Sequence, residues 1–280
     1  MSSLFDFDGP PDAYAVMGNP ITHSKSPAIH AEFAKQTGQR LVYTAIQVDE
    51  GGLAQAIGNF QSNNGKGLNI TVPFKREAWE LVEERSDRAQ SAGAVNTIVF
   101  KTDGTLFGDN TDGVGLVRDL TQNQGIDIKG KRILILGAGG AVRGVLGPVL
   151  NEKPDSIVIA NRTVDKALKL AYEFKSDIRL QGSGFTGLEG RQFDIVINGT
   201  AASLDNEVPP IPASILADDC CCYDMMYGIE PTAFLRWAQS QGVKKTIDGL
   251  GMLVEQAAES FYLWRNVKPE TKPVINMLRE

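Results

Sequence analysis

The sequence predicts an α/β protein with mostly parallel sheets, built as two domains with a cleft between them. Short apolar runs typical of buried strands alternate with segments of helical periodicity along the whole chain. The chain has 280 residues, enough for two hydrophobic cores. A glycine-rich turn that is typical of a nucleotide-binding domain begins only at Gly137, so the preceding residues must form another domain first.

The elements are expected in alternating order. The expected strands are Tyr14–Met17, Leu41–Ile46, Gly67–Thr71, Thr97–Phe100, Arg132–Leu136, Ser156–Ile159, Ile195–Ile197 and Cys221–Met225. The expected helices are Ser26–Thr37, Gly52–Gln61, Phe74–Val82, Val114–Thr121, Gly140–Leu150, Val164–Phe174, Pro231–Gln241 and Met252–Trp264.

Composition excludes several classes of partner. The formal net charge is −6, and no basic block is present to neutralise a nucleic acid or an anionic membrane. The acidic N-terminal segment is not a signal peptide, and no apolar run reaches the length of a membrane span, so we expect a cytoplasmic protein.

The three cysteines are adjacent, from Cys220 to Cys222. Neighbours on a strand point to opposite faces, and the two histidines are far away in sequence, which argues against a metal site. We therefore expect a buried strand, and no metal.

The apolar run Ile133–Leu136 and the residues after it predict a dinucleotide turn. Gly137, Ala138, Gly139, Gly140 and Ala141 follow the run directly. Glycines at that position let backbone amides approach a pyrophosphate at the N-terminus of a helix. The motif is imperfect, because Val142 stands where the third glycine is usual. A tight turn without a ligand is the alternative.

The residues after the next strand indicate which nucleotide is bound. A protein that binds NAD carries an acidic residue there for the ribose hydroxyl. This chain has Asn161, Arg162 and Thr163 instead, with Lys166 just beyond. These cations would attract a 2′-phosphate, so NADP is the expected cofactor.

In the first domain, polar residues gather where strands end. Such residues converge on one crevice of an open α/β sheet. Their hydroxyls, amides, one ammonium and one carboxylate suit a polyhydroxylated acid as ligand. Ser24 and Ser26 could bind its carboxylate at the start of a helix, although an ordinary helix cap is the alternative for Ser26-Pro27.

Lys75 and Asp112 are the candidate catalytic residues. Lys75 follows a Pro-Phe corner at the end of an apolar strand, and Asp112 lies in a loop bounded by glycine. Taken singly, each has an ordinary alternative, as a surface charge or a turn former. Together they form a plausible acid/base couple for a reacting hydroxyl whose hydride is carried by a nicotinamide.

Eight segments spread along the chain carry a recognisable pattern. They are Tyr14–Pro27 (YAVMGNPITHSKSP), Gly65–Lys75 (GKGLNITVPFK), Gly93–Thr97 (GAVNT), Gly108–Gly115 (GDNTDGVG), Gly137–Ala141 (GAGGA), Asn161–Thr163 (NRT), Tyr223–Tyr227 (YDMMY) and Asp248–Ala258 (DGLGMLVEQAA). Together they resemble the shikimate dehydrogenase family, of the single-function bacterial type, and the resemblance extends over nearly the whole length of the chain. The resemblance implies NADPH-dependent reversible reduction of 3-dehydroshikimate to shikimate, a step toward the aromatic amino acids. It also implies an N-terminal open α/β substrate domain and a Rossmann-type NADP-binding domain.

The resemblance assigns roles to matching positions. Lys75 and Asp112 would be catalytic, and the other substrate contacts would be Ser24, Ser26, Asn69, Thr71, Asn96, Tyr227 and Gln256. The dinucleotide would lie on residues 137–141, Asn161, Arg162, Thr163 and Lys166, with Met225 and Gly249 near the nicotinamide and Asp87 as a further cofactor position. Without the resemblance, Gln256 would be interpreted as structural.

We expect the substrate-binding catalytic domain to span residues 1–112 and 249–280, and the NADP-binding domain to span residues 113–248. Gly113 and Gly115 would form a hinge between them. The expected ligands are shikimate and 3-dehydroshikimate, and the chain is expected to be a monomer or a homodimer.

Two segments depart from the family pattern. Ala201 and Ala202 stand where the family often has two serines, and the stretch after Tyr227 is rearranged to residues 228–232. Two other functions stay open. One is a sister oxidoreductase that also accepts quinate, with or without a change of cofactor to NAD, and Arg162 argues against the NAD variant. The other is a nucleotide-sensing protein without turnover, which Lys75 and Asp112 argue against.

Overall fold

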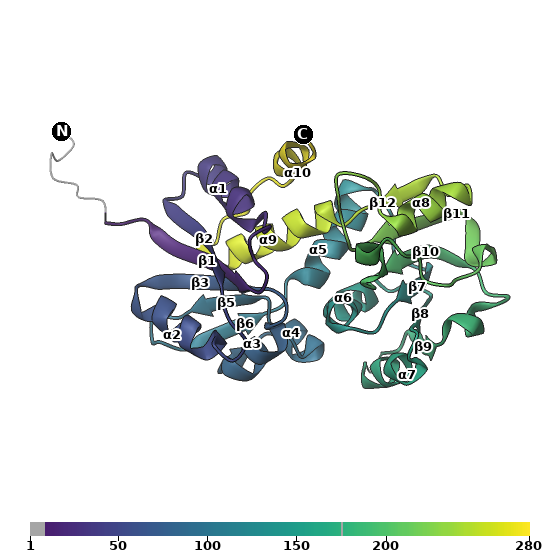
Figure 1. Ribbon diagram of the computed structural model, residues 1–280, viewed down its shortest axis with the longest axis horizontal. Coiled ribbons are helices and arrows are strands. Elements are labelled where there is room, and N and C mark those ends of the chain that lie inside the picture. The colour runs from purple at the N-terminus through teal and green to yellow at the C-terminus, as the bar shows by residue number, and fades with distance from the viewer. Residues whose placement is uncertain (1–8, 175) are drawn as a thin grey trace.

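The computed structural model describes residues 9–174 and 176–280. Their strands form two six-stranded sheets, with the orders β2-β1-β3-β5-β6-β4 and β12-β11-β10-β7-β8-β9. Figure 1 shows the first sheet on the left and the second on the right, each with helices packed beside it. The predicted two-domain α/β class is confirmed.

The first sheet is mixed rather than parallel throughout. Its strands are β1 (Asp12–Gly18), β2 (Leu41–Gln47), β3 (Gly65–Ile70), β4 (Glu84–Arg85), β5 (Thr97–Phe100) and β6 (Leu106–Asp109). β1 pairs in parallel with β2 and β3, and β4 with β6, whereas β5 runs antiparallel to both β3 and β6. The connection from β5 to β6 is far too short for a crossover helix, so these two strands form a hairpin.

Four helices lie between strands of this sheet in the sequence: α1 (Ser26–Thr37), α2 (Leu53–Ser62), α3 (Lys75–Leu81) and α4 (Asp87–Ala92). Apolar side chains of α2, α3 and α4 pack with those of β1, β3 and β5 in one buried cluster that includes Leu53, Leu68, Ala78, Ala89 and Ile98. This packing fixes the ends of β3 and β5, where the candidate site residues of the first sheet lie.

The second sheet is parallel throughout. Its strands are β7 (Arg132–Leu136), β8 (Ser156–Ala160), β9 (Arg179–Ser183), β10 (Phe193–Asn198), β11 (Leu216–Asp224) and β12 (Lys245–Ile247). Read from β9, the order is that of a dinucleotide-binding Rossmann sheet. Its α-helices are α6 (Gly140–Asn151), α7 (Val164–Glu173) and α8 (Ala233–Ser240), and short 3₁₀ turns cover Phe185–Leu188, Ala202–Asp205 and Ala213–Ile215.

Both faces of the second sheet are buried, as the continuous apolar runs predict. Cys221 packs in the cluster on one face, whereas Cys220 and Cys222 pack in the cluster on the other. All three thiols are free and buried, and burial raises the pKa of Cys221 to about 12. The prediction of a buried strand is confirmed, and the described residues contain no group of side chains that could hold a metal ion.

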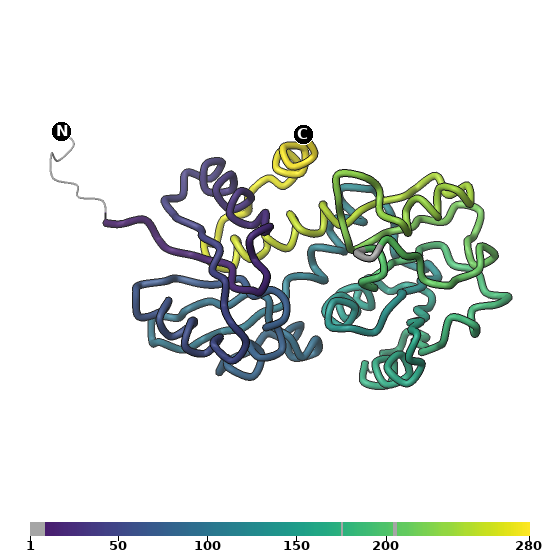
Figure 2. Tube along the Cα trace, viewed as in Figure 1, coloured from purple at the N-terminus to yellow at the C-terminus, as the bar shows by residue number. Residues whose placement is uncertain are grey.

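Two long segments connect the sheets. They are α5 (Asp112–Arg118), continued by a π-helical turn over Asp119–Asn123, and α9 (Leu250–Arg265). The last helix, α10 (Lys272–Arg279), follows α9. Side chains of α1, α9 and α10 share one buried cluster that includes Phe33, Ala257, Phe261 and Val274. Figure 2 shows this yellow C-terminal segment returning to the purple N-terminal part of the chain.

Gly113 and Gly115, which the sequence analysis expects at a hinge between the domains, are helical residues. Both lie inside α5, where α5 packs closely against α6 and α9. A Cβ atom on Gly113 would stand 2.5 Å from Cγ of Pro148, and one on Gly115 would stand 2.7 Å from the carbonyl oxygen of Met252. These glycines are therefore required by close helix packing.

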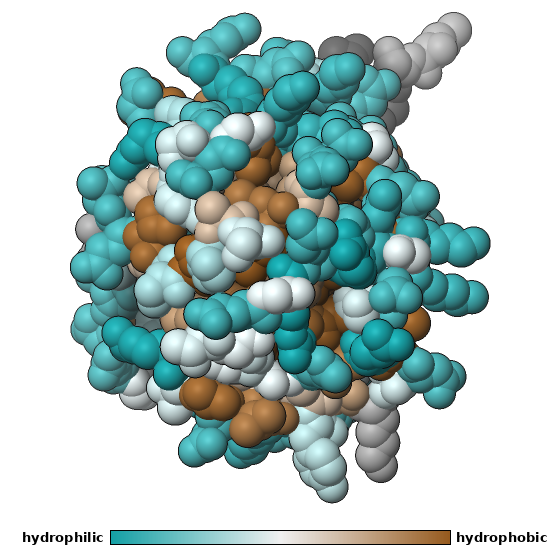
Figure 3. All heavy atoms as spheres, turned by 90° about the vertical axis from the view of Figure 1, so that its right-hand side faces the viewer, coloured by the Kyte–Doolittle hydropathy of each residue, from teal (hydrophilic) through white to brown (hydrophobic). Residues whose placement is uncertain are grey.

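No helix within the described residues is both long enough and apolar enough to cross a membrane. Figure 3 faces the end of the molecule that carries the second sheet, and it shows mainly hydrophilic side chains with hydrophobic ones visible between them. Leu168 and Tyr172 of α7 and Ile229 are among the exposed large hydrophobic residues.

Candidate active site

A cavity of about 300 Å³ brings together every residue that the sequence analysis assigned to the substrate. Its lining includes Ser24, Ser26, Asn69, Thr71, Lys75, Asn96, Asp112, Tyr227 and Gln256. Met225 and Gly249, predicted near the nicotinamide, line it too. Because these residues come from both sheets and from α9, the cavity lies where the two halves of the molecule meet.

Lys75 and Asp112 form an ion pair at this cavity. Lys75 Nζ lies 2.6 Å from Asp112 Oδ2, and the two side chains are 29% and 11% exposed. Each is the first residue of its helix, α3 and α5 respectively. Asn96 Nδ2 donates to the other carboxylate oxygen, Oδ1, at 2.8 Å. The carboxylate therefore fixes the ammonium while one face of the lysine stays open to the cavity.

Ser24 and Ser26 line the cavity at the start of α1, and their role at a substrate carboxylate stays a prediction. The Ser26 backbone amide donates to Ser24 Oγ at 3.3 Å, and Pro27 occupies the first turn of the helix. The structure gives α1 no side-chain cap, because Lys25 is the capping residue. The Ser26-Pro27 pair therefore does not act as an ordinary N-cap.

Asn69 and Asn96 belong to a buried polar network behind the cavity. Asn69 Oδ1 accepts from Tyr43 Oη at 2.7 Å, and Asn69 Nδ2 donates to Thr97 Oγ1 at 3.1 Å and Ser260 Oγ at 3.0 Å. Sequence reasoning missed Tyr43 and Ser260, because a tyrosine on a strand and a serine on an apolar helix look like ordinary packing residues. This network fixes the orientation of the Asn69 amide.

Gln256 is a polar lining residue supplied by α9. Its Oε1 lies 3.4 Å from both Asn96 Nδ2 and Thr111 Oγ1, and its Nε2 donates to the Leu253 carbonyl at 2.8 Å. The hydrogen bond to the Leu253 carbonyl is what a purely structural role of Gln256 would give, but the side chain also lines the cavity.

His30 lies buried behind this network. Its ring stacks on Tyr43 at 4.2 Å between centroids, and neither ring nitrogen has a hydrogen-bond partner among the described residues. Burial lowers the pKa of His30 to about 3, and the nearby Asn69 amide opposes this shift only in part. The imidazole is therefore neutral at physiological pH.

Tyr227, Met225 and Gly249 line the cavity from the second sheet. Burial raises the pKa of Tyr227, so its hydroxyl is protonated at neutral pH. A Cβ atom on Gly249 would stand 2.2 Å from the carbonyl oxygen of Met225. Only glycine allows the start of α9 to approach the end of β11 so closely.

The glycine turn between β7 and α6 can cradle a pyrophosphate. Gly137 has a φ of 105°, a conformation that favours glycine, and Gly139 caps α6. Gly139, Gly140 and Ala141 are exposed, and apart from the adjacent residues and the backbone of the same helix no described heavy atom lies within 4 Å of a Cβ built on Gly139 or Gly140. Val142, the departure from the motif, is buried against Gly199 instead of facing this space. The residues present therefore fit a dinucleotide.

The residues expected to bind the 2′-phosphate follow β8. Asn161 Nδ2 donates to the Thr163 carbonyl at 2.9 Å and shapes the turn. Arg162, Thr163 and Lys166 are exposed, and neither cation forms an ion pair with another described residue. Both positive charges are thus available to a phosphate.

Asp87 lies apart from the cavity with Lys75. It is the first residue of α4 and lines a second, larger cavity of about 930 Å³ between α4, α5 and α6. This cavity flanks α6 rather than the glycine turn at its start. The cofactor role of Asp87 stays a prediction.

The two segments that depart from the family pattern meet at Asp224. This buried carboxylate accepts from Ser203 Oγ at 2.7 Å, Thr232 Oγ1 at 2.6 Å and the Met226 amide at 3.0 Å. Asn198 Oδ1 accepts from Thr200 Oγ1 at 2.7 Å. The structure thus anchors both segments without hydroxyls at Ala201 and Ala202.

The Rossmann sheet, its open glycine turn and the adjoining cavity with the Lys75–Asp112 ion pair define a dinucleotide-dependent oxidoreductase. Comparison with models of protein families identifies the family within this class of enzymes. Residues 16–98 match the shikimate dehydrogenase substrate binding domain, residues 119–205 match shikimate / quinate 5-dehydrogenase, and residues 249–279 match the shikimate 5'-dehydrogenase C-terminal domain. The chain belongs to the shikimate dehydrogenase family.

Individual relatives agree with this membership. The shikimate dehydrogenase (NADP(+)) of Nitrosococcus oceani is 55% identical over 96% of this chain and 95% of its own. Among solved structures, an Ael1 enzyme from Pseudomonas putida has a TM-score of 0.91 and 48% identity, and covers 96% of this chain and 98% of that chain. The shikimate 5-dehydrogenase of Thermus thermophilus, solved with NADP(H) and shikimate, has a TM-score of 0.85 and 32% identity with the same coverage.

Proposed function

We propose that this chain catalyses the NADPH-dependent, reversible reduction of 3-dehydroshikimate to shikimate, in the shikimate pathway of aromatic amino-acid biosynthesis. The observation that carries the proposal is the Lys75–Asp112 ion pair at a cavity lined by all the predicted substrate residues. The membership of the family and the Arg162 and Lys166 cations beyond β8 support NADP as the cofactor.

In this proposal the Lys75 ammonium donates a proton to the carbonyl oxygen of 3-dehydroshikimate as that oxygen becomes a hydroxyl. Bound NADPH would supply the hydride, and NADP would accept it in the reverse direction. In the reverse direction the Lys75 amine takes the hydroxyl proton, and the Asp112 carboxylate stabilises the resulting ammonium 2.6 Å away. Asn96 holds Asp112 so that the carboxylate faces Lys75.

The remaining lining residues orient the substrate. Ser24 and Ser26 bind its carboxylate, and Asn69, Thr71, Asn96, Tyr227 and Gln256 contact its ring hydroxyls. In a complex with the dinucleotide, residues 137–141 would hold the pyrophosphate, Asn161, Arg162, Thr163 and Lys166 would hold the 2′-phosphate end, and Met225 and Gly249 would lie near the nicotinamide. The open space over Gly139 and Gly140 and the shared lining of the cavity support these roles.

The domain division belongs to the same proposal. Residues 1–112 and 249–280 would form the substrate-binding domain, and residues 113–248 the NADP-binding domain. The cluster shared by α1, α9 and α10 supports placing the C-terminal helices with the first sheet. We also propose a cytoplasmic location and a monomer or homodimer.

Initial rates test this function. Purified protein is assayed with shikimate and with quinate, each with NADP and with NAD. We expect oxidation of shikimate with NADP to have the highest kcat/KM. Faster turnover of quinate would make the chain the sister oxidoreductase, and tight NADP binding without turnover of either acid would make it a nucleotide sensor.

A further inference from the structure

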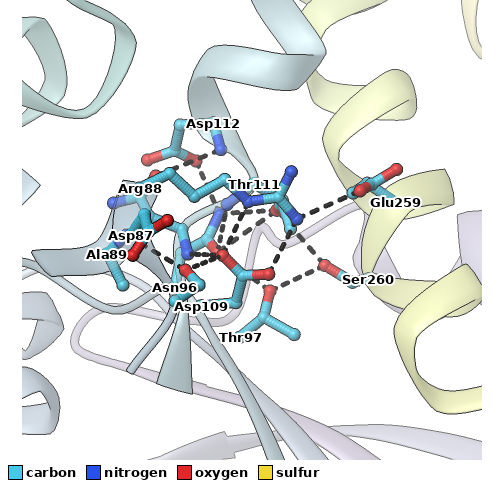
Figure 4. A network of polar contacts seen from close by, with 12 residues as sticks. Asp87, Arg88, Ala89, Asn96, Thr97, Asp109, Thr111, Asp112, Glu259 and Ser260 are labelled. Carbon is cyan, nitrogen blue, oxygen red and sulfur yellow. Dashed lines mark hydrogen bonds and ion pairs between the residues drawn. The ribbon is translucent and has the colours of Figure 1, made fainter. Parts of the chain in front are cut away.

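Two buried carboxylates and two partly exposed arginines form an ion cluster next to the Lys75–Asp112 pair. Arg88 of α4 donates from Nε to Asp109 Oδ1 at 2.6 Å and from Nη2 to Asp109 Oδ2 at 2.7 Å. The same Nη2 donates to Glu259 Oε1 of α9 at 3.0 Å, and Arg118 Nη2 of α5 lies 2.7 Å from Glu259 Oε2. The Asp109 and Glu259 side chains are only 3% and 10% exposed. Figure 4 shows Arg88 between these two carboxylates.

Asp109 connects this cluster to Asp112 through the loop between them. Asp109 Oδ1 accepts from the Asn110 backbone amide at 2.7 Å, and Asn110 Oδ1 accepts from the Asp112 amide at 3.2 Å. The Asp109 carbonyl accepts from the Asn96 amide at 3.0 Å, and Asn96 is the residue that donates to the Asp112 carboxylate. Fixing Asp109 therefore fixes both the backbone and the carboxylate of Asp112.

Glu259 connects the cluster to the same loop from the opposite side. Figure 4 shows Glu259 and Ser260 of α9 facing the segment from Asp109 to Asp112, and Ser260 Oγ lies 3.3 Å from Thr111 Oγ1. Gln256, one turn earlier in α9, lies 3.4 Å from the same Thr111 oxygen through its Oε1. Arg118, the second partner of Glu259, ends the helix that Asp112 begins. The cluster thus holds the segment on both sides of Asp112.

The energetics of buried ion pairs indicate that this cluster fixes the positions of its neighbours rather than stabilising the fold. Replacing a buried ion pair with apolar residues of similar volume is often neutral or stabilising, because desolvation offsets the attraction. A planar guanidinium bound at two points, by contrast, fixes direction as well as distance. We infer that Arg88, through Asp109 and Glu259, is a positioning residue that holds Asp112 in line with Lys75. This inference rests on the proposed function.

Arg88→Lys is the main test, because it keeps the charge and removes the two-point contact. We expect kcat to fall about 10- to 100-fold, the size of loss that a small misplacement of a catalytic group can cause, with KM for shikimate changed less than about threefold. The matched control is Arg132→Lys, which removes a two-point contact with Asp194 far from the cavity. A kcat for Arg88→Lys equal to that of Arg132→Lys would overturn the inference.

A double-mutant cycle separates positioning from loss of folded protein. If Arg88 acts through the catalytic pair, Arg88→Lys should lower kcat in the wild-type chain but not in Lys75→Met, measured at high enzyme concentration. The same fold-loss in both backgrounds would mean that the effect is structural. Should Lys75→Met itself turn over normally, the catalytic role of Lys75 fails, and the comparison of Arg88→Lys with Arg132→Lys still decides the role of Arg88.

Glu259→Gln is the second variant if Arg88→Lys does not fold. It keeps the shape of the side chain and removes one charge from the cluster. We expect the same fall in kcat with little change in KM, together with a displaced pH profile of kcat, because Asp112 would no longer stabilise the Lys75 ammonium to the same degree. An unchanged kcat and pH profile in folded Glu259→Gln would overturn the inference.

Discussion

The Lys75 ammonium contacts the Asp112 carboxylate on one side and lines an open cavity on the other. Its 2.6 Å contact with Asp112 and its partial exposure are what a group needs in order to exchange a proton with a bound ligand. Lys75→Met removes the ammonium and keeps most of the stem. We expect turnover to fall by about 10² to 10⁴, the usual contribution of a positioned acid/base, with binding of NADP retained.

Steady-state rates at saturating shikimate and a fluorescence titration with NADPH measure these two effects. The control is Arg76→Met, the next residue of α3, whose side chain is exposed and pairs only at 3.5 Å with Glu80. Near-normal turnover of Lys75→Met would make Lys75 a positioning charge.

Arg162 is the residue that should choose between the two nucleotides. It is exposed at the end of β8, so a 2′-phosphate can reach it without rearrangement. A charge-assisted hydrogen bond is worth about 1.5–3 kcal/mol, so Arg162→Ala should weaken NADP binding about 10- to 100-fold. Binding of NAD, which lacks the phosphate, should change little.

Dissociation constants for both nucleotides check this, with Lys169→Ala on the exposed face of α7 as a control for loss of one positive charge. Equal losses for NADP and NAD would show that Arg162 does not contact the phosphate. Arg162→Asp should go further and favour NAD, by repelling the phosphate and accepting from the ribose hydroxyl.

Among elements, the crossing of α5 and α9 controls where Asp112 lies. Gly115 is packed so tightly that an added methyl group would meet the backbone of α9, which cannot move aside as a flexible side chain could. Gly115→Ala should therefore destabilise the protein by about 1–3 kcal/mol, the usual cost of overpacking, and lower kcat by moving the start of α5.

Gly58→Ala is the matched control for this substitution. Gly58 lies inside α2, is exposed, and has no described heavy atom within 4 Å of a built Cβ. It should stabilise the protein by about 0.5–1 kcal/mol, the gain of alanine over glycine in a helix, and leave kcat unchanged. Urea unfolding of both variants measures the free energies, and stabilisation by Gly115→Ala would refute the close packing.

The sequence predicted the long apolar elements and missed short or polar ones. All eight expected strands and all eight expected helices are present, because apolar periodicity over several residues records burial directly. Ser26–Thr37, Thr97–Phe100 and Arg132–Leu136 have the expected bounds, and the others are shifted at one or both ends. β4, β6, β9 and β12 were not predicted, since each combines few or no apolar residues with glycine or charge, and α4 and α10 are too short or too polar to show a clear period. The antiparallel β5–β6 pair follows from the missed strand.

The residues of the candidate site also divide into those that the sequence predicted and those that only the structure revealed. Residues at the ends of apolar strands, such as Asn69 and Lys75, were found because strand ends converge at one edge of a sheet. Ser260, Tyr43 and the partners of Arg88 were not found. They act through contacts between residues up to 191 positions apart, which no local pattern records.

For the molecule as a whole, His30 predicts loss of stability in acid. Its pKa is about 3 in the folded state, below the ordinary value of 6.5, so the unfolded chain binds the proton more readily. The contribution of His30 to the free energy of unfolding is complete above pH 6.5 and is lost as the pH falls toward 3. At pH 4.5 the free energy of unfolding should be about 2–3 kcal/mol lower than at neutral pH because of this group.

Urea unfolding between pH 4 and 8 measures this dependence. His30→Phe should flatten the slope below pH 6.5, because phenylalanine can stack on Tyr43 and takes up no proton. The exposed His23 provides the control, since His23→Gln should leave the slope unchanged. The same slope in His30→Phe as in the wild type would assign the acid sensitivity to other groups.

The cluster shared by α1, α9 and α10 has a consequence for the newly made chain. Phe33 emerges from the ribosome early, but its partners Ala257, Phe261 and Val274 are synthesised only after the strands of both sheets. The strands of the parallel sheet, β7 to β12, are all synthesised by residue 247. This sheet can therefore fold while the first sheet still lacks α9 and α10, which pack against α1. We therefore expect the half of the protein that is translated second to fold first, and a chain stopped at residue 248 to bind NADP without forming a pocket for shikimate.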